Sequence, residues 1–242
     1  MGTAFISLGG NLGDVAETFN CAVDFLNEDY GHVSRLSSLY STSAVGENAG
    51  PPFLNAVAEI ETFLPPGELL EGLLQIELKL GRERTVHWGP RTLDLDLLLY
   101  DDMVVDTKTL TIPHPRLWYR RFVLDPLAEV ASNVVHPVRE LSIAKLKRRI
   151  SARPLEISFV RDGAKVAESL VELAHQRFHE VDAALWQAND ESAVVFWWPD
   201  CEVRFEDLPI DRRLDLSREH GDPNQALFDV LVSAGLAPGP TP

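Results

Sequence analysis

The sequence predicts an α+β fold in which helices pack on one face of an antiparallel sheet. Up to Tyr100 the expected elements follow the order strand, helix, strand, strand, helix, strand, which is typical of this class. The segments Phe53–Phe63 and Thr92–Leu99 alternate apolar with polar residues, which indicates strands with one buried face. Between them, Pro65 and Pro66 open an expected helix that runs through Leu80, with apolar residues at helical spacing and Gly81 as the stop residue.

The other elements follow from shorter patterns. A strand over Thr3–Leu8 leads through the turn Gly9–Asp14 into a helix over Val15–Glu28. Up to residue 150 we also expect a strand over His32–Tyr40, a hairpin return over Met103–Asp106, an extended segment over Thr111–Arg116 and a short helix over Phe122–Val130. Beyond it we expect a helix stripe over Val166–Leu185, a hairpin formed by Val194–Trp198 and Glu202–Phe205, and a last helix from Asp222 to Ala234.

Length and composition limit the organisation of the chain. Its 242 residues suffice for one domain with a small appendage, and we divide them into residues 1–150 and a C-terminal α/β extension over residues 151–242. The formal net charge of −15 argues against nucleic acid as a partner, because such binding neutralises phosphates with basic side chains. Two cysteines are too few for a disulfide framework, and no apolar run approaches the ~20 residues of a membrane span. We therefore expect a cytoplasmic protein without a membrane partner.

The segment Gly81–Tyr100 contains the candidate site. Asp94 and Asp96 share one face of the predicted strand, roughly 6.6 Å apart at Cα, so their oxygens are able to converge on one or two Mg²⁺ ions. Three arginines lie upstream: Arg82, Arg84 and Arg91. Arginine carries permanent positive charge and forked donors suited to phosphate. Acids that hold metal beside arginines that hold phosphate predict a metal-nucleotide site for a phosphoryl-type transfer.

An Asp-x-Asp pair on a strand also occurs on ordinary solvated faces, and that interpretation stays open. Two features favour the metal site. The apolar run Leu97–Leu99 indicates a central strand, where two acids are costly unless a cation compensates their charge. The loop Trp88–Pro90, which contains a glycine, is typical of a mobile cover over a site.

Two polar segments nearer the N-terminus are ambiguous. The turn Gly9–Asp14 lacks both the Gly-Lys-Ser/Thr ending of a phosphate loop and the dinucleotide spacing, so we favour a structural connection. Asn55 lies on its strand beside Phe53 and is either an ordinary solvent-facing amide or a group that hydrogen-bonds a flat heterocycle. The loop Ser41–Pro52 is long enough to be functional.

Five motifs carry a family resemblance: SLGGNLGD at Ser7–Asp14, FLNAVAEIET at Phe53–Thr62, IELKLGRER at Ile76–Arg84, WGPRTLDLDLLLY at Trp88–Tyr100 and TIPHPRLWYRRFVLDPL at Thr111–Leu127. With them, the chain resembles the 6-hydroxymethyl-7,8-dihydropterin pyrophosphokinases of folate biosynthesis over about its first 150 residues. The resemblance implies a ferredoxin-like antiparallel sheet with helices packed on it. It also implies ATP as co-substrate and transfer of its β,γ-diphosphoryl group to the hydroxymethyl oxygen of the pterin, with release of AMP.

The resemblance further implies roles for single residues. Asp94 and Asp96 are expected to bind two Mg²⁺ ions that bridge the ATP phosphates, and Arg82 and Arg91 to hold the triphosphate during catalysis. The expected ATP contacts are Glu77, Arg84, Trp88, His114 and Arg120, of which Arg84 and Trp88 lie on a closing loop. The expected pterin slot is lined by Val45, Gly46, Phe53, Asn55 and Phe122.

The chain departs from the family pattern at three places. The linker from Arg84 to Trp88 holds three residues where one more is expected. Leu74 stands where a glutamine often meets the nucleotide, and Thr109 stands where an arginine can. The acids and the arginines of the candidate site are intact, which disfavours a catalytically inactive relative.

Two other functional classes fit parts of the pattern. A nucleotide-sugar transferase also uses an Asp-x-Asp with a metal, but it needs a larger nucleotide domain than this length allows. A non-catalytic nucleic-acid module on a ferredoxin-like sheet conflicts with the negative charge. For the acidic residues 151–242, which contain Trp197 and Trp198, an accessory or oligomerisation role and a plain structural extension both stay open, and the sequence does not identify a protein partner for them.

Overall fold

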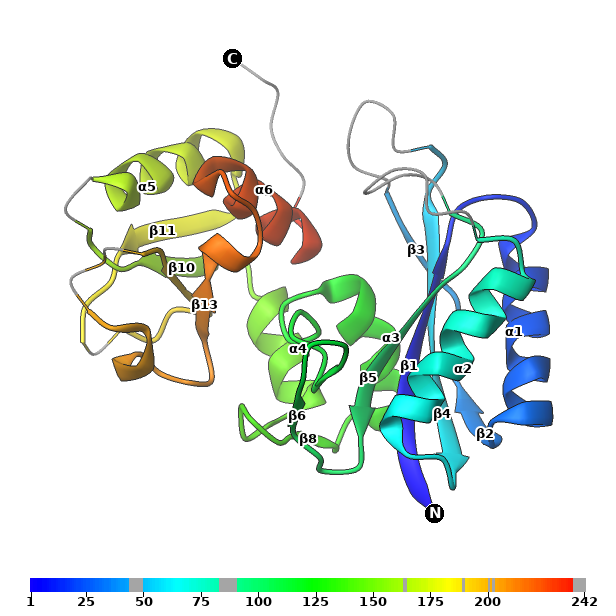
Figure 1. Ribbon diagram of the computed structural model, residues 1–242. Helices are drawn as coiled ribbons and strands as arrows, with labels where there is room; N and C mark the ends of the chain where they lie inside the picture. Colours follow the sequence, from blue (N-terminus) through cyan, green and yellow to red (C-terminus); the bar gives the residue numbers. More distant parts are fainter. Residues whose placement is uncertain are drawn as a thin grey trace. The chain divides into compact units, whose positions relative to one another are not determined.

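The computed structural model describes residues 1–43, 50–82, 91–162, 165–188, 190–199, 201 and 203–236. The chain forms two compact units (Figure 1). Unit 1 consists of Met1–Trp118, Phe122–Pro137 and Ser142–Ala144, and unit 2 of Tyr119–Arg121, Val138–Leu141 and Lys145–Pro242. Within the described ranges, no helix is long and apolar enough to cross a membrane.

Unit 1 is built on a five-stranded antiparallel sheet. Its two longest strands, β1 (Gly2–Gly10) and β4 (Phe53–Thr62), pair along their whole lengths. β5 (Asp94–Tyr100) pairs with the other edge of β1. β2 (His32–Leu36) and β3 (Tyr40–Thr42) both pair with β4, so the order is β2-β4-β1-β5 with β3 beside β2 along β4.

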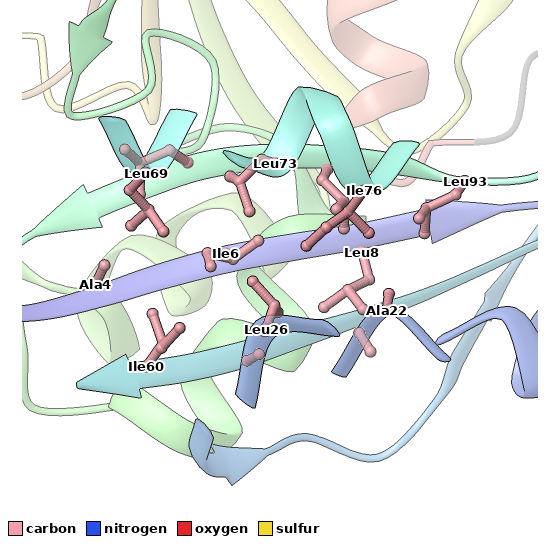
Figure 2. Packing of buried hydrophobic residues seen from close by; sticks show 14 of the residues in the cluster. Ala4, Ile6, Leu8, Ala22, Leu26, Ile60, Leu69, Leu73, Ile76 and Leu93 are labelled. Atoms are coloured by element: carbon pink, nitrogen blue, oxygen red, sulfur yellow. The ribbon is translucent and has the colours of Figure 1, made fainter. Parts of the chain in front are cut away.

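Helices α1 (Val15–Asp29) and α2 (Pro66–Lys79) cover one face of this sheet (Figure 1). Figure 2 shows the core between the sheet and these two helices, in which side chains of β1 meet apolar side chains of both helices. The core residues labelled there are all fully buried: Ala4, Ile6, Leu8, Ala22, Leu26, Ile60, Leu69, Leu73, Ile76 and Leu93. Because successive side chains of a strand alternate between faces, Phe5, Ser7 and Gly9 face the opposite side.

Helix α3 (Arg121–Ala131) lies on that opposite side of the sheet (Figure 1). The Tyr40 hydroxyl of β3 donates a 2.9 Å hydrogen bond to Glu129 of α3. Four short strands belong wholly or partly to unit 1: β6 (Val105–Asp106), β7 (Thr111–Ile112), β8 (Val135–His136) and β9 (Leu141–Ser142). Helix α4 (Ile143–Ser151) follows and belongs to unit 2 from Lys145 onwards.

Most of the elements expected before residue 131 are present, and three expectations were wrong. The expected strand His32–Tyr40 is interrupted, because Ser37 turns inward and exchanges hydrogen bonds with Val57 of β4. β5 is an edge strand of the described sheet rather than a central one, and its Leu98 carbonyl accepts the His114 N–H at 2.8 Å. The return strand β6 pairs with β7 instead of β5.

Unit 2 contains a four-stranded parallel sheet. Its strands are β10 (Leu155–Phe159), β11 (Val181–Leu185), β12 (Val194–Trp197) and β13 (Arg213–Asp215), in the order β11-β10-β12-β13. Its helices are α5 (Val166–Arg177) and α6 (Pro223–Ser233), with 3-10 turns at η1 (Phe205–Asp207) and η2 (Leu216–Arg218). Phe159 and Phe196 stack in its core with ring centroids 5.0 Å apart.

Two expectations for this region were wrong, and one was correct. The helix over Val166–Leu185 ends at Arg177, because β11 follows with Val181 and Ala183 buried and the intervening Asp182 exposed. The hairpin after Val194 is absent from the described residues: β12 pairs in parallel on both sides, and Phe205 opens a 3-10 turn. The last helix begins where expected, capped by the Asp222 carboxylate, which accepts from the Asn224 N–H.

A cluster of arginines around one carboxylate connects the segments of unit 2. Asp211 accepts from Arg149 of α4 at 2.9 Å, and Arg212 also contacts it. Arg139 donates to the backbone carbonyls of Ile210 and Arg213. Burial lowers the pKa of Arg139 to about 9, and Asp211 opposes that shift. Asp211 thus holds partly buried cations that come from distant parts of the chain.

We expect Asp211→Ala to destabilise unit 2 by about 1–3 kcal/mol, because it leaves these cations without their carboxylate. The measurement is an unfolding titration with urea, monitored by tryptophan fluorescence. Asp207→Ala is the matched control, since Asp207 forms an exposed ion pair with Arg204 in the same unit and its loss should hardly matter. Equal midpoints for the two variants would contradict the structural role of Asp211.

Candidate active site

Strand register brings the polar residues of the candidate site together. In the two antiparallel ladders, Gly9 of β1 lies opposite Asn55 of β4 on one side and opposite Asp94 of β5 on the other. Ser7 is likewise opposite Asp96. Residues directly opposite each other share a sheet face, so Asn55 and both aspartates lie on the face away from α1 and α2.

Gly9 lies between these groups and places no side chain there. A Cβ atom at Gly9 would lie 3.6 Å from Asn55 Oδ1 and 3.9 Å from Asp94 Cβ. The absence of a side chain there keeps the surface between the amide and the carboxylate free. Gly10 has a different reason to be glycine, because a Cβ there would lie 2.5 Å from the Thr92 carbonyl oxygen.

Two arginines bind the Asp94 carboxylate. Arg82 Nη2 lies 2.7 Å from Asp94 Oδ1, and Arg91 Nη1 lies 2.5 Å from Asp94 Oδ2. Arg82 also forms an ion pair with Glu77 in the last turn of α2. Among the described residues, these ion pairs join α2, β5 and the residues just before β5.

The Glu77 side chain is buried, with 2% of its surface exposed, and its contacts are with other protein groups. Its Oε1 atom accepts the Leu95 N–H at 2.7 Å, so the carboxylate connects α2 to the start of β5. Burial raises the pKa of Glu77, and the hydrogen bond from Leu95 and the charge of Arg82 oppose that increase. The side chain thus fixes Arg82 in place beside Asp94.

Asp96 differs from Asp94 in its surroundings. Within the described part of the chain, its carboxylate has neither an ion pair nor a hydrogen bond. In the same residues, no group of three or more His, Cys, Asp or Glu side chains is arranged to hold a metal. Two carboxylates on one face fit a cation that takes its remaining ligands from a phosphate or water, as Mg²⁺ commonly does, rather than a metal held by protein alone.

Asn11 is a residue of this site that sequence reasoning missed. Its backbone N–H donates to the Arg91 carbonyl and its Oδ1 accepts the Arg91 N–H, both at 2.9 Å. Its Nδ2 donates to the Pro51 carbonyl at 3.0 Å. The Leu12 N–H also donates to the Arg91 carbonyl. These backbone N–H groups of the glycine-rich turn thus bind the protein's own backbone, as expected for a structural connection.

The amide of Asn55 is held by β3. Its Nδ2 donates to Thr42 Oγ1 at 3.0 Å and to the Tyr40 carbonyl at 3.4 Å. Because a carbonyl only accepts hydrogen bonds, this arrangement assigns the amide nitrogen to β3 and leaves Oδ1 beside Gly9. Phe53, two residues before Asn55, shares its face of β4.

Comparison with known proteins identifies the family of the chain. A sequence model of the 7,8-dihydro-6-hydroxymethylpterin-pyrophosphokinase (HPPK) family matches residues 5–132. The chain belongs to the HPPK family. It is 47% identical over 132 residues to 2-amino-4-hydroxy-6-hydroxymethyldihydropteridine pyrophosphokinase of Bacillus subtilis, covering 54% of this chain and 79% of that protein. It is 38% identical over 155 residues to the protein of the same name from Aquifex aeolicus, covering 64% and 96%.

Membership of the HPPK family confirms the predicted enzyme class. The chain is a pyrophosphokinase of folate biosynthesis, that is, a diphosphotransferase acting on a hydroxymethyldihydropterin with ATP as co-substrate. A solved HPPK-DHPS structure from Plasmodium falciparum matches with a TM-score of 0.51 and 12% identity, over 87% of this chain and 59% of that one. This match supports the mixed fold of helices and antiparallel sheet.

The remaining expected HPPK site residues fall into three groups. Val45, Gly46, Arg84 and Trp88 lie outside the described residues. His114 is half-buried, and its Nδ1 accepts the Arg116 N–H at 3.2 Å. Phe122 lies at the start of α3, and Arg120 belongs to unit 2. The roles of all these residues stay predictions.

The raised pKa of Glu77 gives a pH-dependent prediction. A folded-state pKa above the ordinary 4.5 means that protonating Glu77 favours the folded state, and this contribution is lost as the pH rises through the folded pKa. We therefore expect the stability of the wild type relative to Glu77→Gln to increase as the pH falls from 7 towards 4.5. Urea unfolding at several pH values measures this difference.

The contributions of the other carboxylates to the pH dependence of stability cancel, because the wild type and the Glu77→Gln variant both contain them. Glu68→Gln, on the exposed first turn of the same helix, is the matched control. A wild-type advantage that shrinks with acid would show that the ionised form of Glu77 is the favoured one.

Proposed function

We propose that this site transfers the β,γ-diphosphoryl group of ATP to the hydroxymethyl oxygen of 6-hydroxymethyl-7,8-dihydropterin. The observation that carries the proposal is the shared sheet face on which Asp94, Asp96 and Asn55 flank Gly9 and Ser7. The hydroxymethyl oxygen forms a bond to the β-phosphorus while the bond from that phosphorus to the oxygen bridging the α-phosphorus breaks. AMP leaves with that oxygen, and the hydroxymethyl proton passes to solvent.

The proposal assigns the site to a pyrophosphokinase domain over residues 1–150 with a ferredoxin-like sheet, followed by a C-terminal α/β extension over residues 151–242. The antiparallel order β2-β4-β1-β5 with α1 and α2 on one face supports the first part. The parallel sheet of unit 2 supports the second. A cytoplasmic setting suits the two free cysteines, Cys21 and Cys201.

Asp94 and Asp96 are the proposed ligands of two Mg²⁺ ions. Bound Mg²⁺ would neutralise the phosphate charge and orient the triphosphate for in-line attack. The fit rests on two carboxylates, hard oxygen donors, that lie two residues apart on one face, with no side chain at Gly9 beside them. The protein itself contributes positioning and electrostatics, and no covalent nucleophile is needed.

Arg82 and Arg91 are proposed to exchange partners when the substrate binds. Arg82, Arg91, Glu77 and Asp94 form a cluster of two cations and two anions, so the charges balance before any ligand arrives. A metal-bound triphosphate brings cations for Asp94 and phosphate oxygens for the arginines at the same time. The exchange therefore leaves no partly buried charge unpaired, which would be costly.

The heterocycle is proposed to lie on the Asn55 side of Gly9. Phe53 and Phe122 supply flat apolar surfaces, Asn55 Oδ1 accepts a hydrogen bond from the ring edge, and Val45 and Gly46 complete the slot. Arg84, Trp88, His114 and Arg120 are proposed to contact ATP. Glu77 is proposed to act on ATP through Arg82, because its carboxylate is buried against Arg82 and Leu95.

The decisive experiment mixes the protein with ATP, Mg²⁺ and 6-hydroxymethyl-7,8-dihydropterin and separates AMP from ADP by chromatography. We expect AMP only when the pterin is present, and Asp96→Ala should lower its rate at least about a hundredfold by removing a metal ligand. The variant should fold as well as the wild type or better, because the unpaired Asp96 carboxylate repels Asp94 in the absence of metal.

Thermal unfolding in metal-free buffer provides the control for the Asp96 variant. A fall in stability that parallels the loss of activity would mean that Asp96 is structural. ADP in place of AMP would rule out diphosphoryl transfer.

The exchange of partners predicts how metal binds without nucleotide. Arg91→Met should lower the dissociation constant for Mn²⁺, used as the probe, by about tenfold, which corresponds to about 1.4 kcal/mol. The reason is that Asp94 loses one of its two competing cations. Calorimetric titration of the nucleotide-free protein measures the affinity, whereas the ATP affinity of the same variant should fall.

Arg35→Met is the matched control, because Arg35 pairs with Glu59 on the same sheet and not with Asp94. Unchanged or weaker Mn²⁺ binding by the Arg91 variant would contradict the competition.

A further inference from the structure

Strand β3 has only three residues, and a stretch that is not in a strand separates it from β2. Residues 37–39 leave the sheet between β2 and β3. Ser37 is fastened inward, since its N–H donates to the Val57 carbonyl and its Oγ accepts the Val57 N–H, both at 2.9 Å. Three ladder pairs connect β3 to β4 within the described sheet. A strand this short depends on other contacts to keep its position.

Glu129 of α3 supplies such contacts. Its Oε1 accepts both the backbone N–H and the hydroxyl of Ser38, each at 3.0 Å, and its Oε2 accepts the Tyr40 hydroxyl at 2.9 Å. Both carboxylate oxygens are thus used, and three donors from one short segment converge on one side chain. Hydrogen bonds to a charged acceptor are stronger than neutral ones. The hydrogen bond to Glu129 also raises the pKa of Tyr40.

The position of β3 determines the orientation of Asn55. The amide nitrogen of Asn55 donates to Thr42 Oγ1 and to the Tyr40 carbonyl, and both acceptors belong to β3. Glu129 therefore holds Tyr40 of β3 and Ser38 just before the strand, and Asn55 binds Tyr40 and Thr42 of the same strand. A shift of β3 would release the amide, which could then rotate and present nitrogen or oxygen beside Gly9.

We propose that Glu129 is a positioning residue for substrate recognition: it clamps β3 to α3 so that Asn55 presents its Oδ1 acceptor to the donor edge of the heterocycle. This inference rests on the proposed function, because it assumes that Asn55 meets the pterin ring. It extends that function to a surface helix and a side chain that touches neither substrate nor metal.

The test compares Glu129→Ala with the wild type in two binding titrations, one with 6-hydroxymethyl-7,8-dihydropterin and one with a non-hydrolysable ATP analogue and Mg²⁺. We expect the pterin dissociation constant to rise about tenfold and the nucleotide constant to change less than twofold. In steady state, the KM for the pterin should rise more than kcat falls. Tyr40→Phe removes one of the three hydrogen bonds and should give a smaller effect of the same kind.

Glu59→Ala is the matched control, because Glu59 is a carboxylate of β4 that pairs with Arg35 of β2 and not with β3. Hydrogen exchange of residues 38–42 gives a readout that is independent of catalysis. Exchange there should accelerate in Glu129→Ala and not in Glu59→Ala.

Two outcomes would overturn the clamp: unchanged exchange in residues 38–42, or equal losses of pterin and nucleotide affinity together with a lower melting temperature. Failure of the proposed function is distinct, since it would appear as a wild type that forms no AMP. The exchange experiment decides on the clamp even in that case.

Discussion

The pairing of β1 between β4 and β5 is the constraint on which the site depends. Its register places Gly9 level with Asn55 on one side and with Asp94 on the other, although these residues come from three distant parts of the chain. Side chains of β1 alternate between the two faces of the sheet, and the two faces have different roles. Ala4, Ile6 and Leu8 bury one face against α1 and α2, and the opposite face is left for the polar groups. A slip of one residue would exchange the two faces, so the register that stabilises the core also assembles the site.

The electrostatics of the unliganded site explain why its charges are tolerated. Glu77 is buried and gains from the Leu95 N–H and from Arg82, and Arg82 reaches Asp94 at the same time. Each charge therefore has a partner of opposite sign except Asp96, among the residues described. Asn11 fixes the backbone of Arg91 on both its N–H and its carbonyl. The arginines are thus held beside Asp94 before any ligand binds, so the proposed binding of phosphate would need little further ordering.

Local patterns predicted the elements that carry the site, but not the contacts between them. The alternation over Phe53–Phe63 and Thr92–Leu99 correctly placed Asn55 and the aspartates on strands. It gave no information on strand order, and the apolar run Leu97–Leu99, which predicted a central strand, is buried on an edge strand of the described sheet. The role of Asn11 had no signal beyond an amide in a turn, because its partner Arg91 is 80 residues away. In unit 2, Val181 and Leu185 fit helical spacing as well as a strand, and only the parallel partner β10 decides between them.

The division into units bears on how the extension relates to the enzyme. The family match ends at residue 132, and unit 2 takes up Val138–Leu141 and everything from Lys145 onwards. Arg139 and Arg149 precede residue 151, yet their partners are at Ile210, Asp211 and Arg213. Helix α4 has Leu146 and Ile150 fully buried. A chain cut at residue 150 would thus remove the hydrogen-bond partners of Arg139 and Arg149, whereas Ser142–Ala144 belong to unit 1. The boundary proposed at residue 150 therefore does not coincide with the division between the two compact units.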